Sequence, residues 1–248
     1  MKISIVTVCY NSAETIRDTI ESVLSQSHSD IEYIVVDGAS KDATMSIINE
    51  YAGRIAKVIS EPDRGIYDAM NKGIQAATGD FVGILNSDDI FANDNVMSDL
   101  HRFIEANPDA QATYADLLFV QRNALNSVTR KYTSSGFMPW KIRFGFMIPH
   151  PTFYARRDLF SKLGFYKLDY RVSADFELMA RFLLAGVKAK RMSSTIVKMR
   201  EGGISTTGFW WRIHQNMEIV RACRSNGLYT NIFFIAMKVP FKLASYLK

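Results

Sequence analysis

Cysteine is scarce in this sequence, and no segment is suited to cross a membrane. Only Cys9 and Cys223 occur, too far apart for the ligand spacing of a zinc site. Two such cysteines fit the reduced thiols of a cytoplasmic protein. No apolar run approaches the roughly 20 residues that cross a bilayer, and Met1-Lys2 leads straight into a strand-like segment. We therefore expect a cytoplasmic protein without a signal peptide or a transmembrane anchor.

Glycine-rich phosphate-binding loops are also missing. The first strand-like segment runs into Cys9-Tyr10-Asn11 instead of a dinucleotide fingerprint, and no phosphate loop ending in Gly-Lys-Ser/Thr occurs. No Ser-His-Asp ordering of a hydrolase stands out either. If the chain binds a nucleotide, another group must neutralise its phosphates, and a metal ion is the obvious candidate.

Positive charge in excess is confined to the last 40 residues. Residues 209–248 carry six basic side chains against one acidic side chain, Glu218, whereas residues 1–208 carry 24 of each sign. This asymmetry favours a basic tail on a neutral catalytic body over a nucleic-acid-binding domain.

Residues 1–90 alternate between strand-like and helix-like segments three times. The strand-like segments are 3–8, 33–36, 57–60 and 81–85. This order predicts an α/β fold with a Rossmann-like, mostly parallel central sheet flanked by helices. Polar clusters follow the four strands at 10–11, 37–38, 61–65 and 86–89. Because parallel strands end at the same edge of a sheet, we expect these clusters to form one nucleotide crevice.

The pattern loosens after residue 90. We expect helices at 93–104, 156–163 and 176–185, strands at 112–120 and 148–154, and irregular structure at 121–147. The predicted organisation is a catalytic domain, 1–208, with a nucleotide-binding half, 1–100, and an acceptor-side half, 101–208. A basic, aromatic, helical tail, 209–248, follows it.

Two adjacent carboxylates, Asp88 and Asp89, follow a short apolar strand at 81–85. Neighbouring carboxylates in one crevice repel, which raises the pKa of one of them unless a cation is present. Hard oxygen ligands favour Mg²⁺ or Mn²⁺ held jointly with substrate phosphates. The alternative is that Asp88 caps a following helix and Asp89 supports its dipole.

Other candidate residues have both a functional and a structural interpretation. Asp175 opens the predicted helix at 176–185, either as an N-cap or as a general base facing the crevice. Tyr10 could pack or stack on a planar base, and His150, between two prolines, fits a structural histidine or a ligand contact. For Asp37, Asp63 and Arg64, the alternative to a functional role is a purely structural place in a turn. The pair Gly202-Gly203 indicates either a tight turn or a loop that could close over a ligand.

Taken together, the motifs resemble the family 2 glycosyltransferases of GT-A fold that build bacterial cell-surface polysaccharides. The motifs are Val8-Cys9-Tyr10-Asn11, Asp37-Gly38-Ala39-Ser40, Asp63-Arg64-Gly65-Ile66-Tyr67, Ala77-Thr78-Gly79-Asp80 and Asn86-Ser87-Asp88-Asp89. The resemblance is strong over residues 1–100 and looser over 148–205. It implies transfer of a sugar from a nucleotide-sugar, most often a UDP-sugar, to an acceptor hydroxyl with inversion.

The resemblance also implies a role for each matching residue. Tyr10 would stack on uracil, Val8 would offer backbone contacts, Asp37, Asp63 and Arg64 would bind the base or ribose, and Asp88 would contact the ribose or sugar. Asp89 would hold Mn²⁺ or Mg²⁺ on the diphosphate, and Asp175 would be the catalytic base. This chain has Ala174 where many members have Glu, which weakens the assignment of the base. His150, Gly202 and Gly203 fall where relatives shape the acceptor side.

The tail suggests a further partner. Aromatic residues alternate with basic ones from Phe209 onward, including Phe241 and Tyr246, and Pro240 would kink a helix there. The tail either packs on the domain or lies on anionic lipid at the cytoplasmic face of the inner membrane. Because acceptors in related pathways are lipid-linked, we favour the membrane.

Two other functions remain open. A sugar-1-phosphate nucleotidyltransferase also combines a parallel sheet with a carboxylate-bound metal, but it would want a glycine- and arginine-rich loop where Tyr10-Asn11-Ser12 stands. A catalytically silent nucleotide-binding protein would bind UDP and be indifferent to loss of Asp175.

Overall fold

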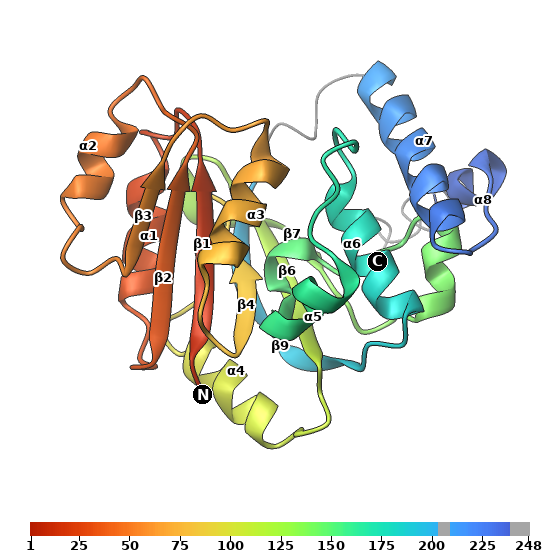
Figure 1. The fold of residues 1–248 in the computed structure, drawn as a ribbon, viewed down its shortest axis with the longest axis horizontal. Coiled ribbons are helices and arrows are strands. Elements are labelled where there is room, and N and C mark those ends of the chain that lie inside the picture. The colour runs from red at the N-terminus through yellow and green to blue at the C-terminus, as the bar shows by residue number, and fades with distance from the viewer. Residues whose placement is uncertain (203–208, 239–248) are drawn as a thin grey trace.

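The computed structural model describes residues 1–202 and 209–238, and Figure 1 shows their arrangement. The first half alternates strands with helices, as predicted. Its strands are β1 (Ile3–Cys9), β2 (Ile31–Asp37), β3 (Lys57–Ser60) and β4 (Phe81–Ile84), and its helices are α1 (Ile16–Leu24), α2 (Thr44–Asn49) and α3 (Ile66–Ala76). The four strands are parallel, in the order β3-β2-β1-β4.

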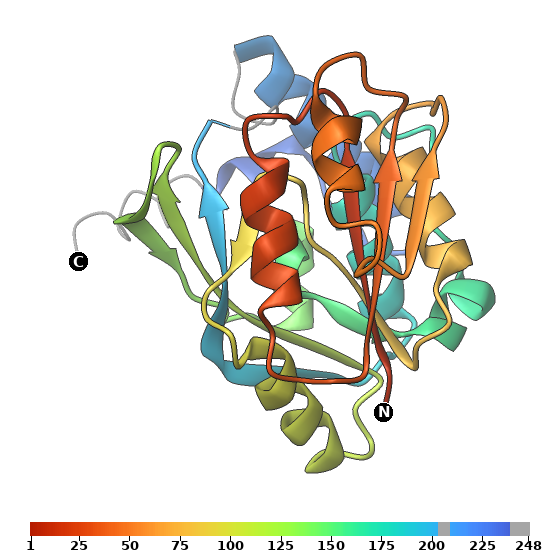
Figure 2. The ribbon, with the colours of Figure 1, turned by 90° about the vertical axis from the view of Figure 1, so that its left-hand side faces the viewer.

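Both faces of this parallel sheet are covered, which explains why its strands are apolar throughout. Side chains of β1 alternate between two core clusters: Ile3 and Ile5 belong to one, Val6 and Val8 to the other. Figure 2 shows α1 and α3 on opposite faces of the sheet. The carboxyl ends of β1, β2 and β3 therefore share one edge, visible as the arrowheads in Figure 1, where the predicted polar clusters meet.

The second half extends the sheet with mixed pairing. Its strands are β5 (Asp89–Phe91), β6 (Ala112–Gln121), β7 (Ala124–Tyr132), β8 (Tyr154–Arg156) and β9 (Ala189–Arg200). Strand β8 pairs antiparallel with β4, and β6, β9 and β5 follow in that order. Its helices are α4 (Val96–Glu105), α5 (Arg157–Leu163) and α6 (Ala174–Leu184). The α/β class is confirmed, with a parallel first half and a mixed second half.

Two local expectations are corrected. The segment 121–147, expected to be irregular, contains β7 and the 3₁₀ helix η1 (Pro139–Phe144). The segment 148–154, expected to be a strand, contains the 3₁₀ helix η2 (His150–Thr152), and β8 begins only at Tyr154. Pro149 and Pro151 lack the N–H groups that a strand ladder needs, which accounts for the late start of β8.

The described part of the tail is helical, as predicted. It forms α7 (Phe209–Ser225) and α8 (Ile232–Ala236), and α7 packs against α6. Ile219 and Cys223 are buried in the same core cluster as the apolar face of α6. No helix within residues 1–202 and 209–238 is long and apolar enough to cross a membrane. Pro240, Phe241 and Tyr246 lie outside the described residues, and the division at residue 208 stays a prediction.

Candidate active site

Tyr10 and Asp63 converge over a glycine at the end of the parallel sheet. Cys9 and Asp37 are register partners in β1 and β2, so the turns that follow them are adjacent. A Cβ at Gly38 would lie 2.4 Å from Oδ2 of Asp63 and 3.4 Å from the Tyr10 ring, so only glycine fits between them. The Tyr10 ring is 59% exposed and thus free to stack on a ligand.

Asp37 is fully buried and bonded within its own turn. Its carboxylate accepts hydrogen bonds from the Ser40 backbone N–H, at 3.1 Å, and from the Ser60 hydroxyl, at 2.8 Å. The Cys9 thiol lies 3.8 Å away, and burial followed by the Asp37 charge raises the pKa of that thiol. Ala39, two residues after Asp37, adopts a positive φ of 60°, so the turn is held in a strained conformation. Asp37 therefore shapes the turn that carries Gly38.

Asp63 and Arg64 are placed differently from one another. Asp63 accepts a hydrogen bond from the Gly65 N–H, at 2.8 Å, which leaves its other oxygen beside Gly38. The Arg64 side chain is 77% exposed and pairs with Asp68 at 3.2 Å. Val8 is buried in β1, two residues before Tyr10. The structure thus brings Tyr10 and Asp63 together and places the Arg64 guanidinium in solvent.

Asp88 and Asp89 follow β4, and the element that comes directly after β4 is the strand β5 and not a helix. Asp89 is 0% exposed and begins β5, so the alternative of a helix cap is excluded. One oxygen, Oδ2, accepts a hydrogen bond from the Asn86 amide at 3.1 Å. Burial and then the Asp88 charge raise the pKa of Asp89 well above its ordinary range, and burial also raises the pKa of Asp88. The charge of the buried Arg200 opposes this rise in the pKa of both carboxylates. Its guanidinium donates a hydrogen bond to the Asp88 carbonyl at 2.9 Å.

The oxygens around Asp89 suit a hard cation. Oδ1 of Asp89 and Oδ1 of Asn86 are both buried and lack a hydrogen-bond partner in the described structure. Unmatched buried acceptors are costly, and a divalent cation prefers such oxygens. The described residues contain no cluster of three His, Cys, Asp or Glu that could hold a metal alone. The donor set therefore fits a cation that also binds substrate phosphates.

Asp175 lies in the first turn of α6, where two polar groups face its carboxylate. The Phe176 N–H donates to Oδ1 at 2.8 Å, and the Tyr67 hydroxyl, which donates to the Val172 carbonyl at 2.6 Å, lies 3.4 Å from the same oxygen. Burial raises the pKa of Asp175, and His150, the Phe176 N–H and the Tyr67 hydroxyl oppose that rise. A carboxylate with a raised pKa is a stronger base than a solvated one.

His150 lies close to Asp175, in η2. Its Nε2 is 2.7 Å from the Tyr166 hydroxyl, and the ring is buried. Burial lowers the pKa of His150 and the Asp175 charge opposes the fall. The neutral ring is therefore favoured, which fits a polar contact near the base.

A cavity of about 170 Å³ lies between Asn86, His150 and Asp175. It is lined by Ile66, Tyr67, Met70, Asn86, His150, Pro151, Arg171, Val172, Asp175, Met199 and Trp211. Asn86, the partner of Asp89, thus shares one cavity with Asp175, although 89 positions separate them in the chain. A larger cavity, about 390 Å³, lies beside α1 and includes Arg200 but none of the residues predicted for the site.

Several residues near this site carry no role of their own in the sequence patterns. Tyr67 belongs to one of the family-like motifs and Trp211 to the aromatic tail, and both line the cavity. Arg200 lies in the segment 198–205 that the resemblance places on the acceptor side. Of the predicted glycines, Gly202 is exposed with a positive φ of 94°, and Gly203 lies outside the described residues.

Comparison with known proteins identifies the family and the fold. Residues 4–164 match the family described as Glycosyl transferase family 2. The chain is 29% identical over 209 residues to a PGL/p-HBAD biosynthesis glycosyltransferase of Mycobacterium bovis, covering 82% of this chain and 79% of the relative. It is 26% identical over 219 residues to the Escherichia coli UDP-Glc:alpha-D-GlcNAc-diphosphoundecaprenol beta-1,3-glucosyltransferase WfaP, covering 86% and 84%.

A solved structure shares the fold. The crystal structure of S. aureus TarS 1-349 in complex with UDP-GlcNAc superposes with a TM-score of 0.72 at 19% identity. The match covers 90% of this chain and 66% of that one, so this chain spans about two thirds of the TarS fragment.

Proposed function

Since the chain belongs to glycosyl transferase family 2, we propose that it moves a sugar from a nucleoside-diphosphate sugar to an acceptor hydroxyl with inversion. The enzyme class, glycosyltransferase, and the predicted GT-A fold are confirmed by the family match, the named relatives and the structural likeness. The donor, the cation, the stereochemistry and the role of each residue are the proposed parts.

The observation that carries the proposal is the cavity shared by Asn86 and Asp175. It joins the segment suited to bind the leaving diphosphate to a carboxylate suited to act as a base. Among the described residues lining the cavity, Asp175 is the only carboxylate. A single displacement needs one group to take the acceptor's proton, and Asp175 can fill that role.

In that displacement, Asp175 takes the proton of the acceptor hydroxyl. The acceptor oxygen then forms its bond to the anomeric carbon from the face opposite the leaving group. The bond from that carbon to the diphosphate breaks, and the nucleoside diphosphate leaves with the electron pair. His150, neutral and close to Asp175, would orient the acceptor, as would the loop at Gly202-Gly203.

The donor would bind at the edge formed by β1, β2 and β4. Tyr10 would stack on the base and Asp63, beside it, would bind the base or ribose, while Asp37 and Val8 hold the turn and strand below them. Because the Arg64 side chain is exposed at the rim of the site, it would contact the donor only from the solvent side. We favour a UDP-sugar, a choice supported by the UDP donor in the name of WfaP and the UDP-GlcNAc bound to TarS.

Asp88, Asp89 and Asn86 are the residues that would hold Mn²⁺ or Mg²⁺, because two of their oxygens are buried and unmatched in the described structure. When bound, the cation would neutralise charge on the leaving diphosphate.

The acceptor would be a lipid-linked glycan of a surface polysaccharide, met at the membrane. WfaP is named for a diphosphoundecaprenol acceptor. An aromatic face, formed by Trp140, Tyr229 and Phe233, supports the membrane side of the proposal. Its rings are exposed, Phe233 by 77%. Trp140 and Tyr229 are linked through ring contacts of Phe144 with Trp140 and Phe234 and of Phe234 with Tyr229, and Phe233 precedes Phe234 in α8.

Basic side chains accompany the aromatic face. The Lys141 ammonium lies 5.7 Å from the centroid of Trp140. Residues 209–248 carry six basic side chains in all, and their one acidic residue, Glu218, is buried. Exposed rings with cations suit the headgroup zone of an anionic membrane.

The test is calorimetric titration of UDP into the protein with Mn²⁺ and then with EDTA. We expect UDP to bind in a Mn²⁺-dependent way and Asp89→Ala to bind it only as weakly as the wild type does in EDTA. Asp30→Ala, an exposed carboxylate away from the site, is the control and should bind as the wild type.

Other results would redirect the proposal. Binding of a different nucleoside diphosphate would keep the fold and change the donor. Absence of any nucleotide binding would refute the enzyme proposed here. A silent binding protein would bind UDP without consuming UDP-sugar, and a nucleotidyltransferase would release pyrophosphate from UTP and a sugar 1-phosphate.

A further inference from the structure

We infer that α7 forms one wall of the acceptor subsite, with the Trp211 ring as the platform against which the acceptor sugar packs. The inference rests on the proposed function and deepens it, because it names the group that recognises the acceptor and the acceptor's chemical class.

The position of Trp211 places it within reach of the reacting groups. It lines the same cavity as Asn86 and Asp175, although it comes from the helix that the sequence assigned to a tail. A molecule that fills this cavity therefore touches the base, the donor segment and the indole ring together. The volume, about 170 Å³, is of the order of one pyranose ring.

The chemistry of the indole ring matches a sugar. Nε1 of Trp211 is buried and has no hydrogen-bond partner in the described structure. A buried donor left unmatched is unfavourable, and sugar hydroxyls are good acceptors. The ring itself offers an apolar face to the C–H side of a pyranose. Trp211 can therefore supply both contacts that a saccharide needs.

Arg171 adds a positive charge beside this ring. Its guanidinium carbon lies 5.7 Å from the Trp211 centroid, and its side chain is exposed at the cavity wall. Guanidinium groups bind phosphate oxygens well. The pair of Trp211 and Arg171 thus fits a saccharide that carries a diphosphate.

Helix α7 is fixed relative to the catalytic base. The Glu218 carboxylate accepts hydrogen bonds from the backbone N–H groups of Arg171, Val172 and Ser173, at 2.7, 2.9 and 2.9 Å. These residues lead into α6, whose N-cap Ser173 makes no side-chain cap of its own. Glu218 therefore holds the segment that leads into the helix carrying Asp175.

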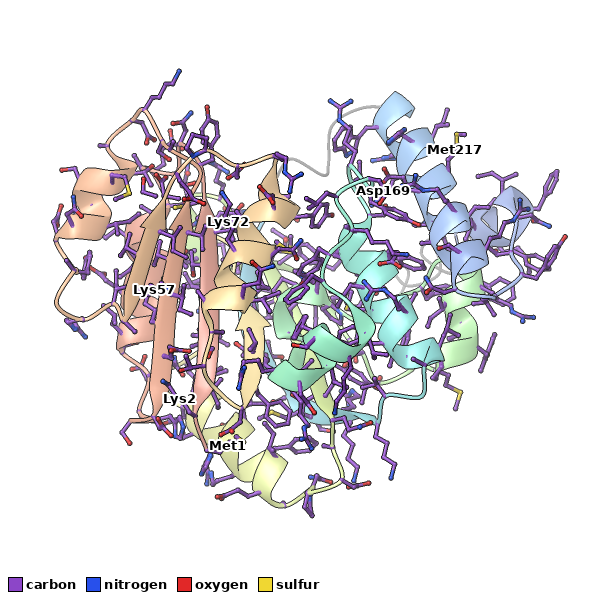
Figure 3. The ribbon with its side chains drawn as sticks, viewed as in Figure 1. Met1, Lys2, Lys57, Lys72, Asp169 and Met217 are labelled. Atoms are coloured by element: carbon purple, nitrogen blue, oxygen red, sulfur yellow. The ribbon has the colours of Figure 1, made fainter. Side chains whose placement is uncertain are left out.

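A second contact reinforces the junction. Arg221 of α7 forms an ion pair with Asp169 at 3.4 Å. Asp169, which is labelled in Figure 3, lies on the loop before α6. The acceptor wall and the base are thus joined as one unit.

The experiment measures acceptor kinetics with UDP-glucose and UDP-GlcNAc as donors. The probe is α-D-GlcNAc diphosphate bearing a short alkyl chain. We expect Trp211→Ala to raise the KM for the probe about tenfold or more, because stacking and the N–H contact are both lost. Trp211→Phe keeps a ring and should raise it about threefold. Met217→Ala, exposed on the same helix in Figure 3, is the control and should change KM less than about twofold.

A second probe isolates the diphosphate contact. Arg171→Ala should raise the KM for the diphosphate probe and leave that for a neutral alkyl glycoside of GlcNAc unchanged. Equal effects on both probes would overturn the diphosphate assignment.

Donor binding and turnover by the wild type separate this inference from the proposed function. UDP affinity should be unchanged in both Trp211 variants, which also shows that they are folded. An unchanged acceptor KM in Trp211→Ala, or a wild type that hydrolyses donor but transfers to neither probe, would overturn the inference. A wild type that neither binds UDP nor consumes UDP-sugar would instead refute the proposed function.

Discussion

The proposed donor and acceptor sides of the site are held together by contacts of different range. On the donor side, each carboxylate accepts a hydrogen bond from a near neighbour: Asp37 from Ser40, Asp63 from Gly65 and Asp89 from Asn86, and Asp37 also accepts one from Ser60, 23 positions away. At the acceptor end, Glu218 caps residues 45 to 47 positions away, and Tyr67 reaches Asp175 across 108 positions. The donor end is therefore a set of short motifs, whereas the acceptor end exists only after the chain has folded.

This difference predicts that substitutions at the two ends act on different kinetic constants. Changes near Asp175 should alter kcat or the acceptor KM, and changes near Tyr10 should alter donor affinity alone.

The largest expected effect comes from Asp175→Asn, which should lower transfer about a thousandfold because general-base catalysis contributes roughly 10²–10⁴. UDP affinity by calorimetry should remain that of the wild type. Because the folded pKa of Asp175 is raised, its ionisation weakens the fold as pH rises through that pKa. The variant should thus have an equal or higher melting temperature at neutral pH. A loss of UDP affinity in parallel with transfer would break the separation of the two ends.

The pH dependence of kcat should give the next largest effect. Only ionised Asp175 can accept the acceptor's proton, so kcat should fall about tenfold per pH unit below its pKa. Because burial raises that pKa, the fall should begin above the ordinary carboxyl value near 3.9. Initial rates at saturating donor and acceptor between pH 4 and pH 8 would measure it. A kcat that stays constant throughout this range would argue against Asp175 as the base.

A smaller effect is expected from Tyr10→Ala. Loss of stacking on the base should weaken UDP binding about tenfold, since such stacks contribute roughly 1–3 kcal/mol. Tyr10→Phe keeps the ring and should bind UDP as the wild type does. Because Tyr10 is exposed, the melting temperature should be unchanged by either substitution. An effect on the acceptor KM in place of UDP affinity would contradict the proposed orientation of donor and acceptor.

The same difference in range explains what could be predicted from the sequence. The parallel half of the fold and the cluster of Tyr10 and Asp63 were predictable because each strand end carries its own polar motif. Asp175 was a candidate base from its local sequence, but that sequence also fits an N-cap, and only the family resemblance favoured the base. The cavity wall at Trp211 was not predictable, because it depends on α7 docking on α6 through Glu218. Likewise, the pairing of β8 with β4 has no local signal in a segment interrupted by two prolines.

The two cysteines have a practical consequence for labelling experiments on this protein. Cys9 lies under the donor turn and Cys223 within the junction of α7 with the domain, and both are buried. Burial raises the pKa of both thiols, that of Cys223 to about 11, so neither presents a thiolate at neutral pH. The native chain is therefore a chemically silent background for thiol labelling. A reporter cysteine placed on the surface of either end would be modified alone, without prior removal of the two that nature placed in the core.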